Sequence, residues 1–459
     1  MKIYQLLVFL LFPVILKAQL ITTIAGIGSA TFSGDGGPAT IAGIPNPADG
    51  VFDRYGNYYF ADGAANRISK IDTAGIITTI AGGAMGGYGG DNGPATAARL
   101  YNPIAARLDS AGNIYIADAA NFRIRKVNSI TGIITTIAGT GTPSYCCDGG
   151  PATAADLYGI QGICLDKFGN LYIADGFNYR IRKVTPAGII STFAGNGIPG
   201  YSGEGTLADT SMIGLGTGMC SDTEGNIYFA NNSISIRVFK INMSGIMKTI
   251  AGNGSYTYSG DGIPATAANI GAVDMAVDNF NNLFLADKVN RRCYKIDATS
   301  GILYNIAGNG IAADSGDGGM ATAASLNVPV GVALDVCGNL YIPTIGNGLI
   351  GAGRRIRKII FNPSCDPYSH IDSVSLYAKS ILTSEVSIYP NPAYGSITIT
   401  ATNKMNQIII TNLICQRVYS QTCDIEKAEV NIAGLPKGVY IVKVTDSEGK
   451  TTVSKILKE

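Results

Sequence analysis

The stretch Ile-Thr-Thr-Ile-Ala-Gly occupies residues 21–26, and its ending, Ile-Ala-Gly or once Phe-Ala-Gly, recurs five more times along the chain. Successive copies lie 56 or 57 residues apart, with their glycines at Gly26, Gly82, Gly139, Gly195, Gly252 and Gly308. So constant a period indicates one supersecondary unit repeated six times, because each unit exposes an apolar face that only its neighbours cover. The repeat therefore decides the fold class.

Each repeat has the pattern of four short antiparallel strands. Gly-Asn pairs such as Gly56-Asn57 and Gly169-Asn170 stand between β-rich runs, where a left-handed backbone suits glycine and is tolerated by asparagine; the fifth repeat has Asn281-Asn282 there. The repeats show no convincing helical period, so each unit predicts one blade of a β-propeller. The lone first strand, residues 21–26, is predicted to complete the last blade and to close the ring, which protects both sheet edges.

The run Asp166-Lys167-Phe168-Gly169-Asn170-Leu171-Tyr172-Ile173-Ala174-Asp175, followed by Asn178, Arg180 and Ile181, resembles an NHL repeat. The resemblance covers roughly residues 20–361 and implies a six-bladed NHL-type β-propeller. It is weakest in the fourth blade, which has Asn231 at the strand end, and in the sixth, which has Pro343-Thr344.

The two ends of the chain differ from the repeats. Residues 1–18 are predicted to be a signal peptide, because Lys2 precedes an apolar stretch that is too short to span a bilayer comfortably. The propeller is assigned to residues 19–361, a linker to 362–384 and a second β-rich domain to 385–459. We therefore expect an all-β mature protein that leaves the cytoplasm and has no transmembrane segment.

The last 75 residues carry three motifs: Tyr-Pro-Asn-Pro, Leu-Pro-Lys-Gly-Val-Tyr and a Lys-Ile-Leu-Lys ending. Together they resemble the type A C-terminal sorting domain of the type IX secretion system of Bacteroidota. The resemblance implies a small immunoglobulin-like β-sandwich that the secretion machinery and its sortase recognise, and a protein that is secreted or held on the outer-membrane surface. An adhesive module is the alternative. The motif residues are Tyr389, Pro390, Asn391, Pro392, Leu435, Pro436, Gly438, Tyr440, Lys455 and Lys458.

Charge and cysteine content narrow the function. Only 15% of residues are charged and the formal net charge is +1, which gives no electrostatic footprint for nucleic acid. Among the nine cysteines, Cys415 and Cys423 could close a hairpin. For the adjacent Cys146 and Cys147, two free loop thiols are favoured over a vicinal disulfide or a metal-reactive pair, because no further ligands surround them at metal-binding spacing.

An acidic residue recurs in the Gly-rich loop after each outer strand, as in Ser33-Gly34-Asp35-Gly36. Calcium requires several oxygen ligands, so these loops are candidate calcium sites. Ordinary turn chemistry, in which an Asp side chain bonds to its own downstream backbone, is favoured instead. The candidate ligands are Asp35, Asp91, Asp148, Glu204, Asp261 and Asp317.

A strand-end Asp and a later Arg recur five residues apart, as in Asp118 with Arg123 and Asp175 with Arg180. Strict repetition of a charge pair indicates a bridge inside each blade. We therefore interpret these pairs as architecture.

One position breaks the symmetry of the repeats. Four residues before the Asp of the Gly-Asn turn, four blades have Ala or Gly, whereas the first has Asp49 and the fifth has Asp274. In NHL-like propellers the innermost strand lines the central channel, so these two carboxylates are a candidate site for calcium or a polar ligand. Asn46 and Gln161 are possible neighbours, and tolerated surface variation is the alternative.

Two classes of function remain. The favoured class is a non-catalytic secreted or surface module that binds a protein or a glycan, with no catalytic residues. The alternative is a calcium-dependent, lactonase-like propeller hydrolase that uses the channel carboxylates. A Ser-His-Asp triad is excluded, because the single histidine, His370, lies outside the propeller.

Overall fold

The computed structural model describes residues 19–83, 85–233, 235–346, 353–361, 386–389, 393–412, 417–447 and 451–458. The chain forms two compact units, Met1–Asp372 and Ser373–Glu459, and their boundary falls within the predicted linker. The predicted signal peptide and linker themselves lie outside the described residues.

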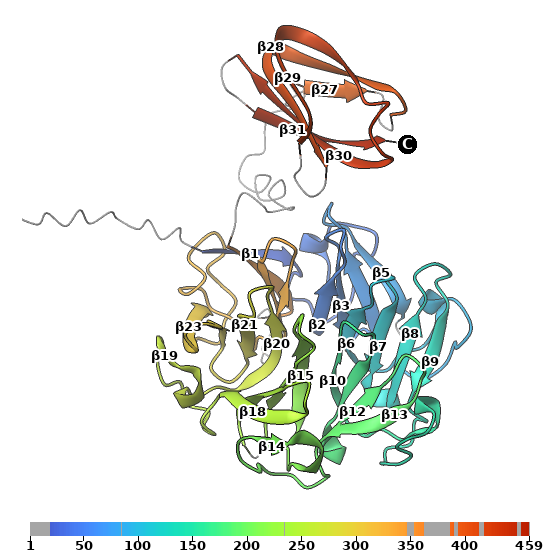
Figure 1. The fold of residues 1–459 in the computed structure, drawn as a ribbon, viewed down its shortest axis with the longest axis vertical. Coiled ribbons are helices and arrows are strands. Elements are labelled where there is room, and N and C mark those ends of the chain that lie inside the picture. The colour runs from blue at the N-terminus through green and yellow to red at the C-terminus, as the bar shows by residue number, and fades with distance from the viewer. Residues whose placement is uncertain are drawn as a thin grey trace, which may run out of the picture. The chain divides into compact units, whose positions relative to one another are not determined.

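The first unit is a ring of six antiparallel sheets (Figure 1). Each sheet is one blade, and its strands run in order from the central channel to the rim. Blade 1 has β2 (Pro47–Phe52), β3 (Tyr58–Asp62), β4 (Arg67–Ile71) and β5 (Ile77–Gly82); blade 2 has β6 (Pro103–Leu108), β7 (Ile114–Asp118), β8 (Arg123–Val127) and β9 (Ile134–Ala138); blade 3 has β10 (Ile160–Leu165), β11 (Leu171–Asp175), β12 (Arg180–Val184) and β13 (Ile190–Ala194).

The other three blades follow the same plan with small additions at the rim. Blade 4 has β15 (Gly216–Ser221), β16 (Ile227–Asn231), β17 (Arg237–Ile241), β18 (Ile246–Ala251) and a short outer strand, β14 (Thr206–Leu207); blade 5 has β20 (Ala272–Val277), β21 (Leu283–Asp287), β22 (Arg292–Ile296), β23 (Ile302–Ala307) and β19 (Ile263–Pro264); blade 6 has β24 (Ala333–Leu334), β25 (Leu340–Thr344), β26 (Arg355–Ile360) and β1 (Leu20–Ala25).

Short 3-10 turns join these strands. Five precede inner strands: η1 (Ala39–Ile41), η2 (Ala95–Ala97), η4 (Ala152–Ala154), η6 (Ala208–Thr210) and η7 (Ala265–Ala267). Two link the second strand to the third: η3 (Ala119–Asn121) and η5 (Gly176–Asn178).

The first strand of the chain closes the ring, as predicted. β1 pairs antiparallel with β26, so that Leu20 lies opposite Ile360 and Ile21 opposite Ile359. Ile21 is fully buried within the core of blades 5 and 6. The all-β prediction of six blades with a shared sixth sheet is confirmed.

The hairpin between the first two strands of a blade depends on one aspartate. Asp166 accepts hydrogen bonds from the backbone N–H groups of Phe168 and Asn170, both at 2.9 Å. Gly169 has φ +80°, and in the fifth blade Asn281 takes φ +63°, as the Gly-Asn pattern predicts. Apolar side chains of neighbouring blades pack face to face. One buried cluster joins blade 2, through Ile124, to blade 3, through Ile163 and Ile173.

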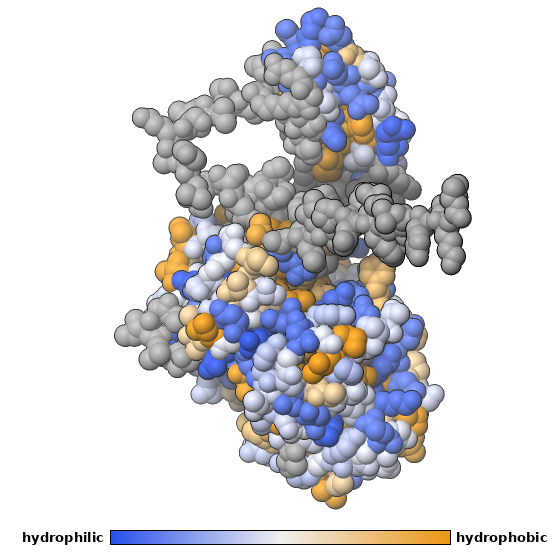
Figure 2. All heavy atoms as spheres, turned by 90° about the vertical axis from the view of Figure 1, so that its left-hand side faces the viewer, coloured by the Kyte–Doolittle hydropathy of each residue, from blue (hydrophilic) through white to orange (hydrophobic). Residues whose placement is uncertain are grey.

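Outside this core, the propeller surface has no continuous apolar band on the side shown in Figure 2. Hydrophobic residues there lie in separate patches among hydrophilic ones. Isolated exposed apolar residues of this kind are common in soluble domains.

The second unit is one curled sheet. Its strands are β27 (Val386–Tyr389), β28 (Ser396–Asn412), β29 (Arg417–Asn431), β30 (Gly438–Asp446) and β31 (Thr451–Lys458), in the order β27-β28-β30-β31 with β29 also on β28. β28 shifts register between Thr400 and Met405, which lets one long strand contribute to both ends of the sheet. Ile397, Ile399, Ile408 and Val442 are fully buried inside the curl.

The predicted sorting residues occupy defined places in this unit where the structure describes them. Tyr440 is buried in the core and donates its hydroxyl hydrogen to the carbonyl of Pro436 at 2.8 Å, and Leu435 packs against the same core. Gly438 begins β30, Lys455 and Lys458 belong to β31, and Tyr389 ends β27. Pro390, Asn391 and Pro392 lie outside the described residues.

Candidate functional site

The inner strands bring the two predicted channel carboxylates together. Asp49 on β2 and Asp274 on β20 are 7% and 2% exposed. Between their blades lies Gly331 of blade 6, where an added Cβ would be 3.3 Å from the Cα of Asp49 and 3.5 Å from Oδ2 of Asp274. The small residue therefore lets blades 1 and 5 approach each other across blade 6.

A third charged group, Arg107 on β6, completes the cluster. Its Nη1 lies 2.6 Å from Oδ2 of Asp49, and its Nη2 donates to the carbonyl of Met219 on β15 at 3.3 Å. The guanidinium thus links inner strands of blades 1, 2 and 4. We call Asp49, Arg107 and Asp274 the channel cluster.

Arg107 was missed by the sequence analysis, although the signal was present. Two residues after the position of Asp49 and Asp274, the blades have Val51, Arg107, Cys164, Cys220, Ala276 and Ala333. Arg107 is the one charged residue among these six equivalent positions. The symmetry criterion that selected the two aspartates selects Arg107 as well.

Burial decides the protonation of the channel cluster. It raises the pKa of Asp274 well above its ordinary value, and the nearby charge of Asp49 raises it further. Burial also raises the pKa of Asp49, although Arg107 opposes this effect. The Arg107 guanidinium partly balances the charge of Asp49, whereas Oδ1 of Asp49 and Oδ1 of Asp274 are buried without a hydrogen-bond partner among the described residues.

Asn46 and Gln161 lie at the mouth of the channel where the inner strands begin, which we call the first mouth. Asn46 directly precedes β2, and an added Cβ on Gly63 would lie 3.0 Å from its Nδ2 and 2.6 Å from Oδ1 of Asn102. Gln161 is the second residue of β10, and its Cγ would lie 2.8 Å from a Cβ on Gly176. The two predicted neighbours thus belong to the first mouth, on blades 1 and 3.

On the other side of the channel cluster lies a cavity of about 280 Å³. Arg107, Cys164 and Cys220 contribute to its lining together with aliphatic side chains. Burial raises the pKa of the Cys164 thiol to about 12, so this thiol is neutral at physiological pH. The cavity offers one guanidinium and an apolar wall.

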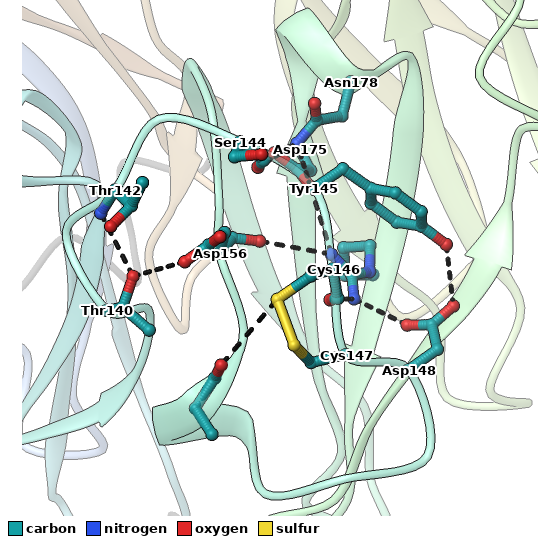
Figure 3. Close-up of a disulfide and its surroundings, with 12 residues drawn as sticks. Thr140, Thr142, Ser144, Tyr145, Cys146, Cys147, Asp148, Asp156, Asp175 and Asn178 are labelled. Atoms are coloured by element: carbon teal, nitrogen blue, oxygen red, sulfur yellow. Dashed lines mark hydrogen bonds and ion pairs between the residues drawn. A yellow bond between two sulfur atoms is a disulfide. The ribbon is translucent and has the colours of Figure 1, made fainter.

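The six loop carboxylates lie at separate rims, each within its own blade. Asp148 accepts a hydrogen bond from Tyr145 (Figure 3). It also accepts hydrogen bonds from Thr192 and from Nη2 of Arg182, the last at 2.5 Å. Although burial opposes it, these bonds hold the pKa of Asp148 below its ordinary value. Asp91 and Asp317 likewise pair with Arg125 and Arg357, and Asp35, Glu204 and Asp261 accept backbone N–H groups of the outer strand.

These contacts fasten the incoming loop to the outermost strand of the blade. Among the described residues, no group of three or more His, Cys, Asp or Glu side chains has an arrangement that could hold a metal ion. The oxygens of the loop carboxylates accept hydrogen bonds from protein N–H and O–H groups.

The predicted pairing of each strand-end Asp with the Arg five residues later was wrong in blades 2 and 3, where the structure shows an ion pair of that Asp with another arginine. Asp118 pairs with Arg125 at 3.4 Å and not with Arg123, and Asp175 pairs with Arg182 at 3.3 Å. The Arg123 guanidinium instead lies 3.8 Å from the ring centroid of Tyr88 and donates to the carbonyl of Asn121. The buried arginine two residues later is the one that reaches the strand-end acid.

Comparisons with known proteins agree with both units. Residues 387–459 match the family model of the secretion system C-terminal sorting domain, and residues 140–199 match that of the teneurin NHL domain. The chain is an NHL-repeat propeller followed by a type IX secretion sorting domain. The sorting domain implies delivery to the cell surface or the exterior and interaction with the type IX secretion machinery.

The curated relatives match about half of this chain, which spans about a tenth of their own length. Mouse teneurin-4 is 28% identical over 286 residues, which cover 54% of this chain and 10% of the teneurin. Human teneurin-1 is 26% identical over 313 residues, 58% of this chain and again 10% of the relative. The NHL propeller thus corresponds to a small part of these proteins.

Two solved structures show the same fold. An auxiliary nutrient binding protein of Bacteroides ovatus superposes with a TM-score of 0.54 at 14% identity, covering 75% of this chain and 76% of that one. A Bacteroides thetaiotaomicron protein of unknown function gives 0.53 at 18% identity, with 74% and 76% covered. Identities this low establish fold and not function.

The cysteines of the NHL propeller include one vicinal disulfide, Cys146–Cys147 (Figure 3), so the prediction of two free thiols was wrong. The pair stands where blade 1 has Ser33-Gly34, and Cys147 adopts φ +70° where Gly34 has +84°. The repeat itself supplies the left-handed residue at this place. Cys423 is a free thiol, and its proposed partner Cys415 lies outside the described residues.

No helix among the described residues has the length and apolar character needed to cross a membrane. The predicted signal peptide, residues 1–18, lies outside the described residues.

Proposed function

We propose that this protein is a non-catalytic binding module, exported through a signal peptide at residues 1–18 and the type IX machinery with its sortase, whose NHL propeller presents a face to a protein or glycan. The observation that carries the proposal is the channel cluster. The Arg107 guanidinium lies 2.6 Å from Asp49, and burial raises the pKa of Asp274 well above its ordinary value, so a guanidinium competes with a cation for one channel aspartate and burial disfavours charge on the other.

The alternative, a calcium-dependent hydrolase, needs several oxygen ligands around the ion. The two channel aspartates are the residues that would begin such a site, and the observation that favours it is that both lie close to Gly331. A guanidinium within 2.6 Å of Asp49 competes directly with a divalent cation for the same carboxylate. We therefore place the binding module first.

Metal analysis and thermal unfolding of the purified full chain test the choice. An ion that binds only the folded state raises the melting temperature, by an amount that grows with the logarithm of its concentration above the dissociation constant. We expect no stoichiometric calcium and equal melting temperatures with calcium and with chelator. A bound calcium whose stabilisation disappears in Asp49→Ala, but not in Asp35→Ala at the rim, would overturn the proposal in favour of the hydrolase.

A further inference from the structure

Three aromatic side chains form a continuous row at the first mouth on blades 2 and 3. The ring centroids of Tyr158 and Phe177 lie 4.9 Å apart at an interplanar angle of 63°, and those of Phe122 and Tyr158 lie 5.9 Å apart at 67°. Phe177 is 47% exposed and Tyr158 is 38% exposed. We call these three residues the aromatic row; such edge-to-face geometry fixes the rings relative to one another.

The aromatic row is not part of the repeating scaffold. At the place of Phe177, two residues after the strand-end acid, blades 1 and 2 have Ala64 and Ala120. At the place of Tyr158, blade 1 has Pro45 and blade 4 has Gly214, and only blade 2 also has an aromatic residue, Tyr101. A feature that serves the propeller architecture would recur in all blades, whereas this one is confined to two.

A glycine under the row lets the rings pack closely. Phe122 has φ +53°, but this left-handed conformation belongs to the repeat, since Asn66, Tyr179 and Arg291 take it at the same place in other blades. Gly159 has φ +67°, and a Cβ there would lie 2.3 Å from Cδ2 of Phe177. The Phe177 ring therefore rests directly on the Gly159 backbone.

Charged side chains beneath the row already have protein partners for their hydrogen-bonding groups. Asp175 is fully buried, accepts the backbone N–H of Tyr158 at 2.7 Å and pairs with Arg182. Arg180 donates to the carbonyls of Asn178 and Asn196, both at 3.0 Å. Because these charged groups already have protein partners, the surface favours an uncharged ligand.

Polar side chains at the edge of the row are amides. Gln161 lies against Gly176, the residue before Phe177. Asn178, the residue after it, donates to Asp175 and to the carbonyl of Ser144, next to the Cys146–Cys147 loop (Figure 3). Gln161 is left as the amide that can donate to and accept from ligand hydroxyls.

The size of the row decides between a saccharide and a protein. A buried aromatic residue contributes about 150–250 Å², so three rings exposed by half or less offer roughly 200–300 Å². A stable protein interface needs about 800 Å² on each partner. The available area is that of one or a few sugar rings.

We propose that the aromatic row is a saccharide-binding subsite, in which the rings stack on the apolar C–H faces of neutral pyranose units and Gln161 bonds to their hydroxyls. The inference rests on the proposed binding function and names its ligand class.

Affinity electrophoresis of the full chain against soluble β-glucan, xylan, mannan and purified bacterial O-polysaccharide tests the inference. We expect at least one polysaccharide to retard the wild-type protein, and Phe177→Ala and Tyr158→Ala each to weaken that retardation about tenfold, since one ring contact contributes up to about 1.5 kcal/mol. Phe177→Tyr, which keeps the ring, and Phe280→Ala, an 81% exposed ring on a hairpin of blade 5, are the matched controls and should bind as wild type.

Melting temperatures of all variants separate lost binding from lost folding. Retardation that survives both alanine variants, or that Phe280→Ala removes equally, would overturn the assignment to the aromatic row while leaving the binding function intact. No retardation by any of the four polysaccharides would overturn the saccharide class, and a protein ligand captured through the same rings would then replace it. Calcium-dependent hydrolysis of a probe would instead refute the proposed function itself.

Discussion

Replacing Arg107 with methionine tests whether one buried charge pair holds the channel together. The substitution keeps an unbranched side chain but removes the guanidinium that lies 2.6 Å from Asp49, in a pair whose side chains are only 13% and 10% exposed. Breaking a buried pair by removing one partner costs about 3–5 kcal/mol. Because Asp49 escapes part of that cost by taking up a proton, we expect a loss of about 3 kcal/mol in the free energy of unfolding at pH 8.

The loss depends on pH, and burial gives its sign. Burial raises the pKa of Asp49 in the folded state, and in Arg107→Met the opposing guanidinium is gone. The folded variant then keeps a proton that the unfolded chain releases near pH 4, so stability falls by about 1.4 kcal/mol for each pH unit between the unfolded and the folded pKa. The variant should be close to wild type at low pH and fall behind as the pH rises.

Urea unfolding followed by circular dichroism at pH 5 and pH 8 measures this difference, provided that the slope m stays constant. Arg54→Met, at an exposed position in a blade 1 hairpin, is the matched control and should cost less than about 0.5 kcal/mol. Adding Asp49→Asn to Arg107→Met should recover most of the loss, because it removes the unpaired charge. A loss that is equal at both pH values would refute the reasoning.

Reduction by a small dithiol should lower the melting temperature of the wild type more than that of Cys146→Ser/Cys147→Gly, which carries the residue pair of blade 1 and keeps the disulfide of Cys337; equal shifts would contradict a stabilising role of Cys146–Cys147. In blade 4, Phe239 stands at the place of Arg125 and Arg182, and Asn231 stands at the place of the strand-end acid. Phe239→Arg should cost about 3 kcal/mol in urea unfolding, because the buried guanidinium then meets a neutral side chain at the strand end. Adding Asn231→Asp should recover at least half of this lost free energy of unfolding, because the two new side chains would form an ion pair. If the losses of the two single variants simply add, the two side chains do not pair. A chain lacking residues 385–459 should accumulate in the periplasm, which cell fractionation would reveal, and unimpaired export would exclude the sorting role.

The fold could be predicted from the sequence because two local signals recur along it: an Ala-Gly ending in six copies 56–57 residues apart, and a Gly-Asn turn in five of the six repeats. Ring closure was equally accessible, since a strand without a partner at one end implies a missing strand at the other. The side-chain pairing was not, because Asp118 and Arg123 are register partners on neighbouring strands while the cation–π contact with Tyr88 draws Arg123 away. Spacing predicts which backbones meet, but competing partners decide where a long side chain goes.

The candidate site was predicted in part for a related reason. Asp49 and Asp274 broke the repeat and did meet in the channel, whereas Arg107 approaches them from another blade, at a position offset by two residues. The aromatic row was also visible as a departure from the repeat at Tyr158 and Phe177, but its significance depends on ring contacts between blades that no single repeat encodes. Aligning the six units position by position reveals which residues depart, and the structure shows which departures converge.

The pairing of Leu20 with Ile360 sets a condition on when this protein can finish folding. About 340 residues must emerge before the first strand meets its neighbour, and closing so long a segment carries an entropic cost that only the completed sixth blade can offset. Until then β1 and β26 each keep an unpaired edge, which is a hazard for aggregation. Along the proposed export route, a ring that closes only when β26 is present would reach its final shape after the chain has crossed the inner membrane.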